Sequence, residues 1–486
     1  MILAGAMAIA PVSAGVAAPA ECLVRFAVPG GTGSPDAPAL ACRDGDAACD
    51  ADGVENGACL VGVVFCSGIA PCPAAPTANV RFRGPGAASL SAALAAAEPA
   101  APTCTAPVEV AIERGFAARR TRTIRARASD ASGRMRDRDR VRIACEGPRA
   151  PRAVIVATDF ETGLLVRTPV AAPSRARTLA TPVHADALVR VVGGTAVVVN
   201  RYLGDNVQVL NDRLGTRLQC STGVGSNPHD IVAVGPRKAY VTRYDRDALW
   251  VVDPQATSCS AFRLGTIALG GLADGDGLPE MSQMAVAGSR VFVSLQRLDR
   301  RSGFTGRETS LLAVVDGESD TLVGAIELQG RNSFADSSGI QREPGTGKLL
   351  VPQAGSIFRT GDGGIERVDP DAMVSEGFVV TEDALGGTIA DFIVVSAERG
   401  YAIVIDEALR NLLVAFDPQT GVLVRRVFAS TQFLADVVAA PDGTIWLADR
   451  SLPRPGIRVF DAASGEPVRR GTASVGLPPF SIGFVP

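Results

Sequence analysis

A unit of three short β-rich runs recurs along most of the chain and limits what the chain can fold into. The clearest copy spans residues 227–254 and contains the runs PHDIVAV, AYVTRY and LWVVDP, separated by turn residues. Another copy lies just upstream, with the runs PVHAD, AVVVNRY and VQVLN. One such unit cannot bury both of its faces alone, so the copies must stack as a propeller or a solenoid.

The two ends of the repeat region complete each other. With the strands of a unit labelled a to d, residues 152–181 supply strands b, c and d but no strand a. Residues 480–485 supply a strand a with nothing after it, and six whole units lie between. We therefore predict an all-β fold: a seven-bladed propeller over residues 152–486, closed by the C-terminal strand. Closure removes the sheet edges that would otherwise invite aggregation.

The repeats resemble the YVTN family of β-propellers, which is related to the NHL and lactonase-like propellers. The resemblance covers about residues 152–486 and is best in residues 227–254. It implies a propeller fold but no single activity, because such propellers include binding and surface proteins as well as enzymes. A lyase or lactonase of this kind would need a His with Glu, or metal-ligating Glu, Asn and Asp at strand ends. No complete set of this kind is present, and we assign no catalytic residue.

A cysteine-rich segment precedes the repeats. Eight of the ten cysteines lie before residue 150: Cys22, Cys42, Cys49, Cys59, Cys66, Cys72, Cys104 and Cys145. This density predicts a disulfide framework formed in an oxidising compartment, with 105 possible pairings left open. Alternating runs favour a small disulfide-rich, β-sandwich-like domain over residues 21–147, and residues 148–151 read as a stiff linker.

The N-terminus fits export. Residues 1–20 are small and apolar and end in an A-x-A cleavage pattern, although a basic start is missing, so a signal peptide could begin further upstream. No other stretch is long and apolar enough to span a membrane. The formal net charge of -3 argues against nucleic-acid binding. We expect an exported protein (periplasmic, cell-surface or extracellular) that is monomeric and has an unknown ligand or protein partner.

An acidic loop in the cysteine-rich segment has part of a calcium-binding pattern. Its carboxylates are Asp44, Asp46, Asp50, Asp52 and Glu55. Counted from Asp44 as in an EF-hand, positions three, nine and twelve are acidic, but position five is Ala48 and position six is Cys49 instead of Gly. Asp and Gly are also ordinary turn residues. Calcium is therefore a weak candidate, and we expect no other cofactor.

Polar residues align at the start of strand a, which lines the channel of a propeller. They are Asp186, Asp230, Gln283, Ser338, Asp391, Asp436 and Ser481. Arg201 and Arg243 end strands b on the same face, and His229 precedes Asp230. Such a ring could bind a cation or a hydroxyl-rich ligand. Alternatively, each side chain satisfies backbone groups of its own loop or pairs with a nearby arginine.

These features favour a non-catalytic binding or scaffold protein. The competing interpretation is a propeller hydrolase or lyase with its site at the channel mouth. A His–carboxylate pair or a metal at the ring would favour the enzyme, whereas Asp–Arg pairs would favour binding. Cys220 and Cys259 fall on strand d of neighbouring blades, where they form either a bridge or two buried thiols.

Overall fold

The computed structural model divides into two compact units, residues 1–149 and 150–486. In the second unit it describes residues 151–486 except 301, 302, 304, 305, 307, 336, 338 and 357–360. In the first unit it describes only the backbone of the strands. The acidic loop and Ser338 lie outside the described residues, and so do Cys22, Cys49, Cys66 and Cys72.

The strands of the first unit form two sheets. Their bounds are β1 Val24–Ala27, β2 Leu40–Arg43, β3 Cys59–Phe65, β4 Thr77–Phe82, β5 Ser89–Ala93, β6 Ala95–Ala96, β7 Cys104–Val110, β8 Arg122–Ser129 and β9 Met135–Glu146. The sheet orders are β1-β3-β7-β6 and β2-β9-β8-β4-β5. The hairpin of β8 and β9 lies where the alternating pattern placed one. A sandwich stapled by disulfides remains a prediction for this unit.

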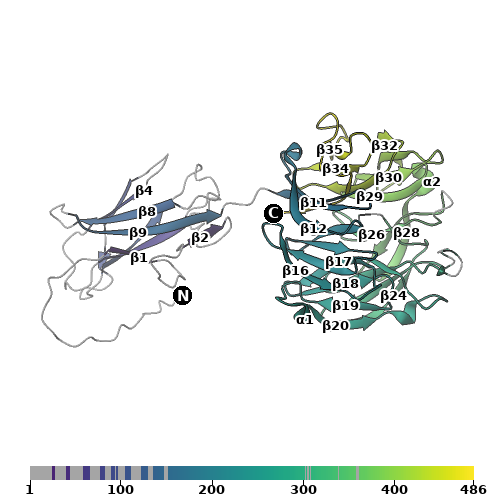
Figure 1. The fold of residues 1–486 in the computed structure, drawn as a ribbon, viewed down its shortest axis with the longest axis horizontal. Helices are drawn as coiled ribbons and strands as arrows, with labels where there is room; N and C mark the ends of the chain where they lie inside the picture. Colours follow the sequence, from purple (N-terminus) through teal and green to yellow (C-terminus); the bar gives the residue numbers. More distant parts are fainter. Residues whose placement is uncertain are drawn as a thin grey trace. The chain divides into compact units, whose positions relative to one another are not determined.

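The second unit is a seven-bladed β-propeller, as predicted (Figure 1). The first three blades are β36 Pro479–Val485 with β10 Arg152–Thr158, β11 Gly163–Pro169 and β12 Arg177–Val183; then β13 Ala187–Val192, β14 Thr195–Asn200, β15 Asn206–Leu210 and β16 Thr216–Ser221; then β17 Pro228–Gly235, β18 Lys238–Arg243, β19 Ala248–Val252 and β20 Arg263–Ala268. The next two are β21 Met281–Ala287, β22 Arg290–Leu295, β23 Leu311–Asp316 and β24 Thr321–Glu327; then β25 Gln341–Arg342, β26 Leu349–Gln353, β27 Gly364–Asp369 and β28 Val374–Thr381. The last two are β29 Thr388–Ser396, β30 Arg399–Ile405, β31 Asn411–Phe416 and β32 Leu423–Ser430; then β33 Leu434–Ala439, β34 Thr444–Asp449 and β35 Gly456–Asp461.

Helices in the described residues are short. They are η1 Pro173–Arg175, α1 Cys259–Phe262, η2 Gly270–Leu272 and α2 Glu382–Leu385. None of them has the length and apolar character that crossing a membrane requires.

Burial explains the composition of the strands. The middle strands, such as β14 (TAVVVN) and β22 (RVFVSL), are buried along almost their whole length, because neighbouring blades cover both faces of each sheet. The outer strands β16 and β24 instead alternate between exposed and covered residues, so they carry polar side chains. This difference produces the apolar runs that are visible in the sequence.

In two blades, a tyrosine of strand b ties the blade to the next one. The hydroxyl of Tyr401 in blade 6 donates to the carbonyl of Ala462 in the strand c–d turn of blade 7 at 2.9 Å. Tyr240 in blade 3 makes the equivalent contact with Asp320 of blade 4. The Tyr of the AYV pattern therefore packs its ring between two blades and satisfies its polar end on the neighbour.

The C-terminal strand lies inside the first blade. β36 pairs antiparallel with β10, with Arg152 opposite Val485 and Ile155 opposite Ile482. The order of this sheet is β12-β11-β10-β36, so the strand furthest along the chain is the innermost one. Figure 1 shows the C-terminus beside the strands of this first blade.

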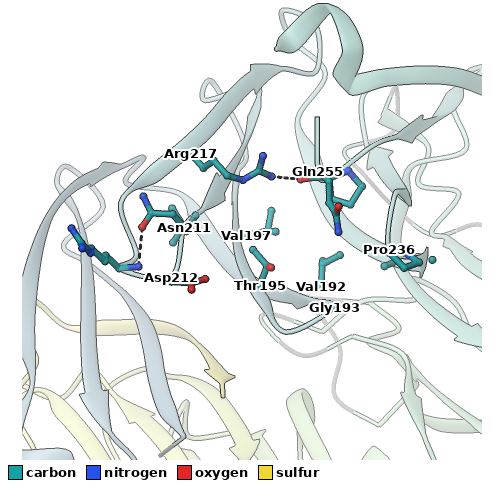
Figure 2. Close-up of a pocket in the computed structure, with 14 residues that line it drawn as sticks. Val192, Gly193, Thr195, Val197, Asn211, Asp212, Arg217, Pro236 and Gln255 are labelled. Carbon is teal, nitrogen blue, oxygen red and sulfur yellow. Dashed lines mark hydrogen bonds between the residues drawn. The ribbon is translucent and has the colours of Figure 1, made fainter. Parts of the chain in front are cut away.

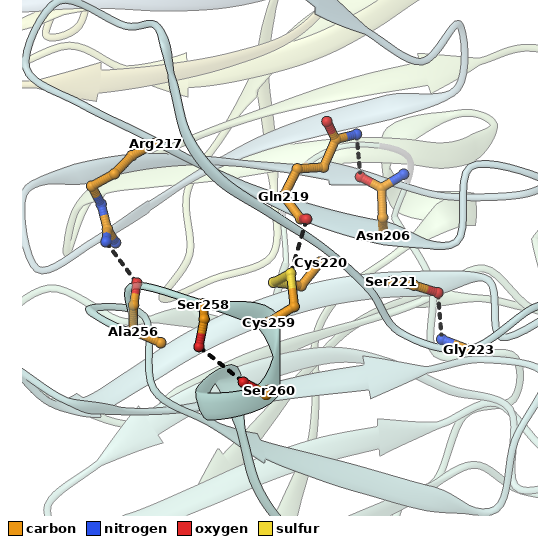
Figure 3. The surroundings of a disulfide bond; sticks show 10 residues. All are labelled: Asn206, Arg217, Gln219, Cys220, Ser221, Gly223, Ala256, Ser258, Cys259 and Ser260. Atoms are coloured by element: carbon orange, nitrogen blue, oxygen red, sulfur yellow. Dashed lines mark hydrogen bonds between the residues drawn. A yellow bond between two sulfur atoms is a disulfide. The ribbon is translucent and has the colours of Figure 1, made fainter.

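Cys220 and Cys259 form a disulfide with a Cα–Cα distance of 5.3 Å (Figure 3). The expectation that both lie on strand d of adjacent blades is only half right. Cys220 lies in β16, but Cys259 begins α1, a single helical turn that precedes β20. The outer strands of neighbouring blades diverge, and the helical turn before β20 brings Cys259 close enough to Cys220 for a disulfide.

Candidate functional site in the central channel

The inner strands are irregular where the aligned polar residues lie. Pairing of strands a and b shifts register between Pro228 and Ile231 in blade 3, between Met281 and Met284 in blade 4, between Ile389 and Asp391 in blade 6, and between Leu434 and Val437 in blade 7. A bulge turns the side chain at that point away from the regular alternation. Asp230, Gln283, Asp391 and Asp436 each lie within or next to such a bulge.

These side chains form a ring of hydrogen bonds between blades. Each contact joins a polar group of one blade to the next blade or the segment leading into it: Asp230 Oδ2 with Met284 N (2.8 Å), Gln283 Nε2 with Ala335 O (2.7 Å), Gln341 Oε1 with Val394 N (3.1 Å), Asp391 Oδ2 with Val437 N (3.0 Å), Asp436 Oδ2 with Ile482 N (2.7 Å) and Ser481 Oγ with Val189 N (3.2 Å). The polar ring therefore satisfies backbone groups, although on the neighbouring blade and not in its own loop.

Blade 2 closes this ring differently. β13 pairs with β14 in regular register, and Asp186 lies before the strand instead of inside it. The contact with blade 3 comes from Arg190, whose Nε donates to Asp230 Oδ1 at 2.7 Å. The alignment of Asp186 with the ring was therefore wrong, because blade 2 lacks the bulge found in blades 1, 3, 4, 6 and 7.

The two arginines expected to neutralise the ring lie elsewhere. Arg201 pairs with Asp186, 2.9 Å from Nε to Oδ1. Arg243 donates to the carbonyl of Thr222 and stacks on Trp250 at 4.6 Å from the ring centroid. Sequence reasoning missed Arg190, although a charged residue inside the apolar run ALVRVV was an available signal. It also missed Gln341, which takes the ring position of blade 5.

A cavity of about 430 Å³ lies inside the channel. Its wall includes Arg190, Asp230, Ser337 and Asp436, together with apolar residues of the inner strands. Three buried polar atoms of this wall have no hydrogen-bond partner: Arg190 Nη2, Ser337 Oγ and Asp436 Oδ1. Asp436 is 1% exposed and Ser337 2% exposed, and a buried polar group without a partner is costly. This concentration of unsatisfied groups marks the cavity as the candidate site.

The carboxyl group of Asp436 is perturbed by its surroundings. Burial raises its pKa to about 6, although the N–H of Ile482, the neighbouring Asp391 and Ser337, and the charge of Arg190 all act in the opposite direction. At neutral pH this group therefore carries most of its negative charge but accepts a proton readily. Asp230 offers no comparable free oxygen, because both of its carboxylate oxygens already accept hydrogen bonds.

His229 lies at the channel mouth in a tightly packed contact. Its Nδ1 is 3.1 Å from Ser282 Oγ, and its ring stacks on Tyr244 with the centroids 4.2 Å apart. Burial, with the positive charges of Arg201 and Arg190, lowers the pKa of His229 well below its usual range. The ring is therefore neutral. Throughout the described part of the chain, neither histidine forms an ion pair with a carboxylate.

Among the residues that the structure describes, one cluster of three carboxylates has the spacing of a metal site. Asp274, Asp276 and Glu280 place one oxygen each within 4.8 Å of one another. However, Glu280 Oε1 accepts from Arg300 Nε at 2.9 Å and Oε2 from Leu298 N at 3.2 Å. Asp276 Oδ2 accepts from the backbone N–H of Arg300 at 3.1 Å. Arginine and backbone groups therefore occupy the oxygens that a metal would use.

A second hollow of about 660 Å³ lies between blades 2 and 3, at their strand a–b and c–d turns (Figure 2). It shares Val192, Gly193 and Ala233 with the wall of the channel cavity, so the two spaces adjoin. Arg217 crosses it and donates to the carbonyl of Ala256 at 2.9 Å. Arg217 is thus already paired by its contacts with the neighbouring blade.

Comparison with known proteins supports the fold and leaves the function open. No protein-family model matches the chain, and no curated protein is similar to it in sequence. A solved protein from Lactobacillus plantarum is similar in structure, with 11% identity over 69% of this chain and 99% of that one, and a TM-score of 0.51. At this identity the similarity concerns the fold alone.

Two further solved structures are more distant in shape. A candidate 6-phosphogluconolactonase from Bacteroides fragilis has 14% identity, 70% coverage of this chain, 99% of that chain and a TM-score of 0.45. The dihydro-heme d1 dehydrogenase NirN in complex with DHE has 15% identity, covers 74% of this chain and 72% of that chain, and has a TM-score of 0.43. The resemblance of the repeats to the YVTN family stays a prediction.

Proposed function

We propose that this protein is a non-catalytic binding protein that takes a small polar ligand into the channel of its propeller. The observation that carries the proposal is the cavity whose wall holds three buried, unpartnered polar atoms on Arg190, Ser337 and Asp436. Native proteins pair nearly all such groups, and a ligand with complementary groups would satisfy them.

The pairing of the mouth residues favours binding over catalysis. Asp186 and Asp230 are held by arginines, and His229 is held by Ser282 and Tyr244. Ser282 is itself buried, so it is not positioned as an exposed nucleophile. A hydrolase or lyase would need a base with a free path to substrate, and these contacts oppose that role.

Thermal unfolding in the presence of small ligands tests this proposal. The panel contains neutral polyols, carboxylates, phosphates, amines and amino acids, each added to the parent protein and to Gly339→Val. Gly339 lines the cavity, and a Cβ added there would lie 4.0 Å from its closest neighbours, so valine places its side chain in part of the cavity. Gly275→Val, at an exposed glycine with open space around it, is the matched control.

We expect at least one class to stabilise the parent and the Gly275→Val control but not Gly339→Val. Mass spectrometry of the recovered ligand should show no chemical change. The proposal is wrong if no class stabilises the parent, if Gly339→Val binds as the parent does, or if the ligand is converted.

We also propose that the protein is exported. The Cys220–Cys259 bridge supports this, because structural disulfides persist mainly in oxidising compartments. Fractionation of the producing cells would test it, with the mature protein expected outside the cytoplasm and its two propeller cysteines oxidised.

A further inference from the structure

We infer that the ligand of the channel is a neutral polyhydroxylated molecule, a sugar or a polyol, and not an ion. This inference rests on the binding function proposed above and specifies the chemistry of the same site. It follows from which polar atoms of the wall are free and from which charges are already neutralised.

The cationic group of the wall is already paired. Arg190 donates from Nε to Asp230 Oδ1 at 2.7 Å and from Nη1 to the carbonyl of Val189 at 3.3 Å. Only Nη2 remains without a partner. An anionic ligand would therefore find one free nitrogen, Nη2, on a guanidinium whose charge is balanced by Asp230. It would also face the carboxylate of Asp436, and like charges in a partly dry site repel.

A cation fits no better. The free acceptors are Asp436 Oδ1 and Ser337 Oγ, whereas calcium needs six to eight oxygen ligands. No three carboxylates of the described channel wall converge within the distance that a metal site needs. An organic ammonium could pair with Asp436, but it would leave the N–H of Arg190 unsatisfied and would place a second positive charge in the same cavity.

A hydroxyl group matches all three free atoms. It accepts from Arg190 Nη2, donates to Asp436 Oδ1, and does either with Ser337 Oγ. Adjacent hydroxyls on one carbon frame can therefore satisfy the wall without adding charge. The rest of the wall, including Ile231, Met284, Val438 and Ile482, is apolar and suits the C–H faces of such a frame.

A zwitterion is the closest competitor, because its carboxylate could face Arg190 and its ammonium could face Asp436. Binding it would require the removal of water from two full charges, and the Coulomb attraction gained in a buried site often fails to offset that cost. Removing water from the hydroxyl groups of a neutral ligand costs less free energy than removing it from two full charges. The free atoms therefore favour a neutral ligand over a zwitterionic one.

Calorimetric titration with matched sugars tests the inference. Three series keep the ring and replace one hydroxyl-bearing group with a charged group: glucose, glucuronate and glucosamine; galactose, galacturonate and galactosamine; mannose, mannuronate and mannosamine. Glycerol, myo-inositol and glycine extend the set to acyclic and cyclic polyols and to a zwitterion. We expect a neutral member to bind at least tenfold more tightly than its charged counterparts, with Gly339→Val abolishing the binding.

Two serine variants connect the binding to the free atoms. Ser337→Ala should weaken the binding of the neutral ligand about tenfold, because it removes one hydrogen bond with the ligand. Ser337 Oγ makes no hydrogen bond of good geometry in the protein, although it lies near enough to Asp436 to lower the pKa of that carboxyl, so the ligand-free variant should differ little in stability from the parent. Ser333→Ala is the matched control: Ser333 Oγ is also buried and unpartnered, but it does not line the cavity.

The possible outcomes separate the two proposals. Channel binding that is blocked by Gly339→Val but strongest for a uronate, an amino sugar, another ion or glycine overturns the inference and leaves the binding function standing. Equal loss of affinity in Ser337→Ala and Ser333→Ala also overturns it. If no ligand of any charge class binds, the channel holds water and both proposals fail.

Discussion

The carboxylate of Asp436 in blade 7 accepts a hydrogen bond from the backbone N–H of Ile482 at 2.7 Å, and Ile482 belongs to the strand that completes blade 1. The last blade therefore holds the C-terminal strand by a side-chain contact, in addition to the backbone pairing with β10. Both contacts are lost together if that strand is removed.

Deletion of residues 480–486 should abolish cooperative unfolding. The truncated protein would expose the edge of β10 and the apolar contacts of Ile482, Phe480 and Val485 with the core. We expect aggregation or a broad transition by circular dichroism, not a small shift. Deleting only Pro486, which follows the strand, is the control and should leave the melting curve unchanged. A sharp, unshifted transition in the longer deletion would show that β36 does not close the propeller.

Asp436→Asn should change how stability depends on pH. The pKa of Asp436 is about 6 in the folded protein, above its ordinary value, so the folded state binds this proton more tightly than the unfolded chain does. The stabilisation from this group is present at low pH and is lost as pH rises through 6. Asp436→Asn has no titrating group at this position, so its stability does not fall in this way as pH rises.

Urea midpoints at pH 4.5 and pH 7.5 measure the effect. Stability of the parent relative to Asp436→Asn should fall as pH rises across this interval. Burial also raises the pKa of Glu280 and Glu382 to about 7, but these residues are present in both proteins, so their effects cancel in the difference. A difference that stays constant with pH would contradict the raised pKa of Asp436.

Asp230→Asn should destabilise the propeller by about 2–4 kcal/mol, because it leaves the guanidinium of Arg190 in the channel without its counter-charge. Asp186→Asn is the matched control: it breaks the pair with Arg201, in which the Asp186 side chain is 30% exposed, and should cost less than about 1 kcal/mol. Chemical unfolding of both variants gives the comparison. Equal losses of stability would mean that the pair of Asp230 and Arg190 contributes no more than the pair of Asp186 and Arg201.

Replacing Cys220 and Cys259 with serine together should lower stability by up to about 4 kcal/mol, the chain-entropy value for a loop of 39 residues. The reduced parent should lose a similar amount, whereas the serine variant should not respond to reductant. Unfolding with and without reductant tests this. A reductant effect of the same size on the serine variant would place the sensitive bond in the first unit.

The first unit should contain four disulfides. Its eight cysteines lie in a segment with a small core, where bridges supply much of the stability. Cys42 and Cys145 are register partners in the parallel pair of β2 and β9, so they are the first combination to seek. Mass mapping of the non-reduced protein should find no free thiol before residue 150. Several free thiols there would contradict the prediction.

The repeat pattern was sufficient to predict the propeller, because strands b and c must be apolar on both faces when blades stack. It also identified Asp230, Asp391 and Asp436 as inner residues. It did not reveal that each of them would accept a hydrogen bond from the next blade, since this depends on bulges that two chain segments form together.

The residues that define the cavity were harder to find from sequence. Arg190 lies in a regular strand, where its position relative to Asp230 follows from the contact between two blades and not from the repeat alignment. Ser337 resembles any loop serine, and no sequence signal separates it from Ser333. Arg190 and Ser337 matter because packing leaves one polar atom of each unpaired, and this follows only from the three-dimensional structure.

The disulfide and the ring of inner contacts are related by position. Six of the seven boundaries between blades use a hydrogen bond to a backbone group, whereas the boundary of blades 2 and 3 uses the ion pair of Arg190 and Asp230. Cys220 and Cys259 link these same two blades on the outside. An ion pair weakens in salt and a covalent bond does not. The one contact of the inner ring that is an ion pair therefore lies at the boundary that a covalent bond also holds.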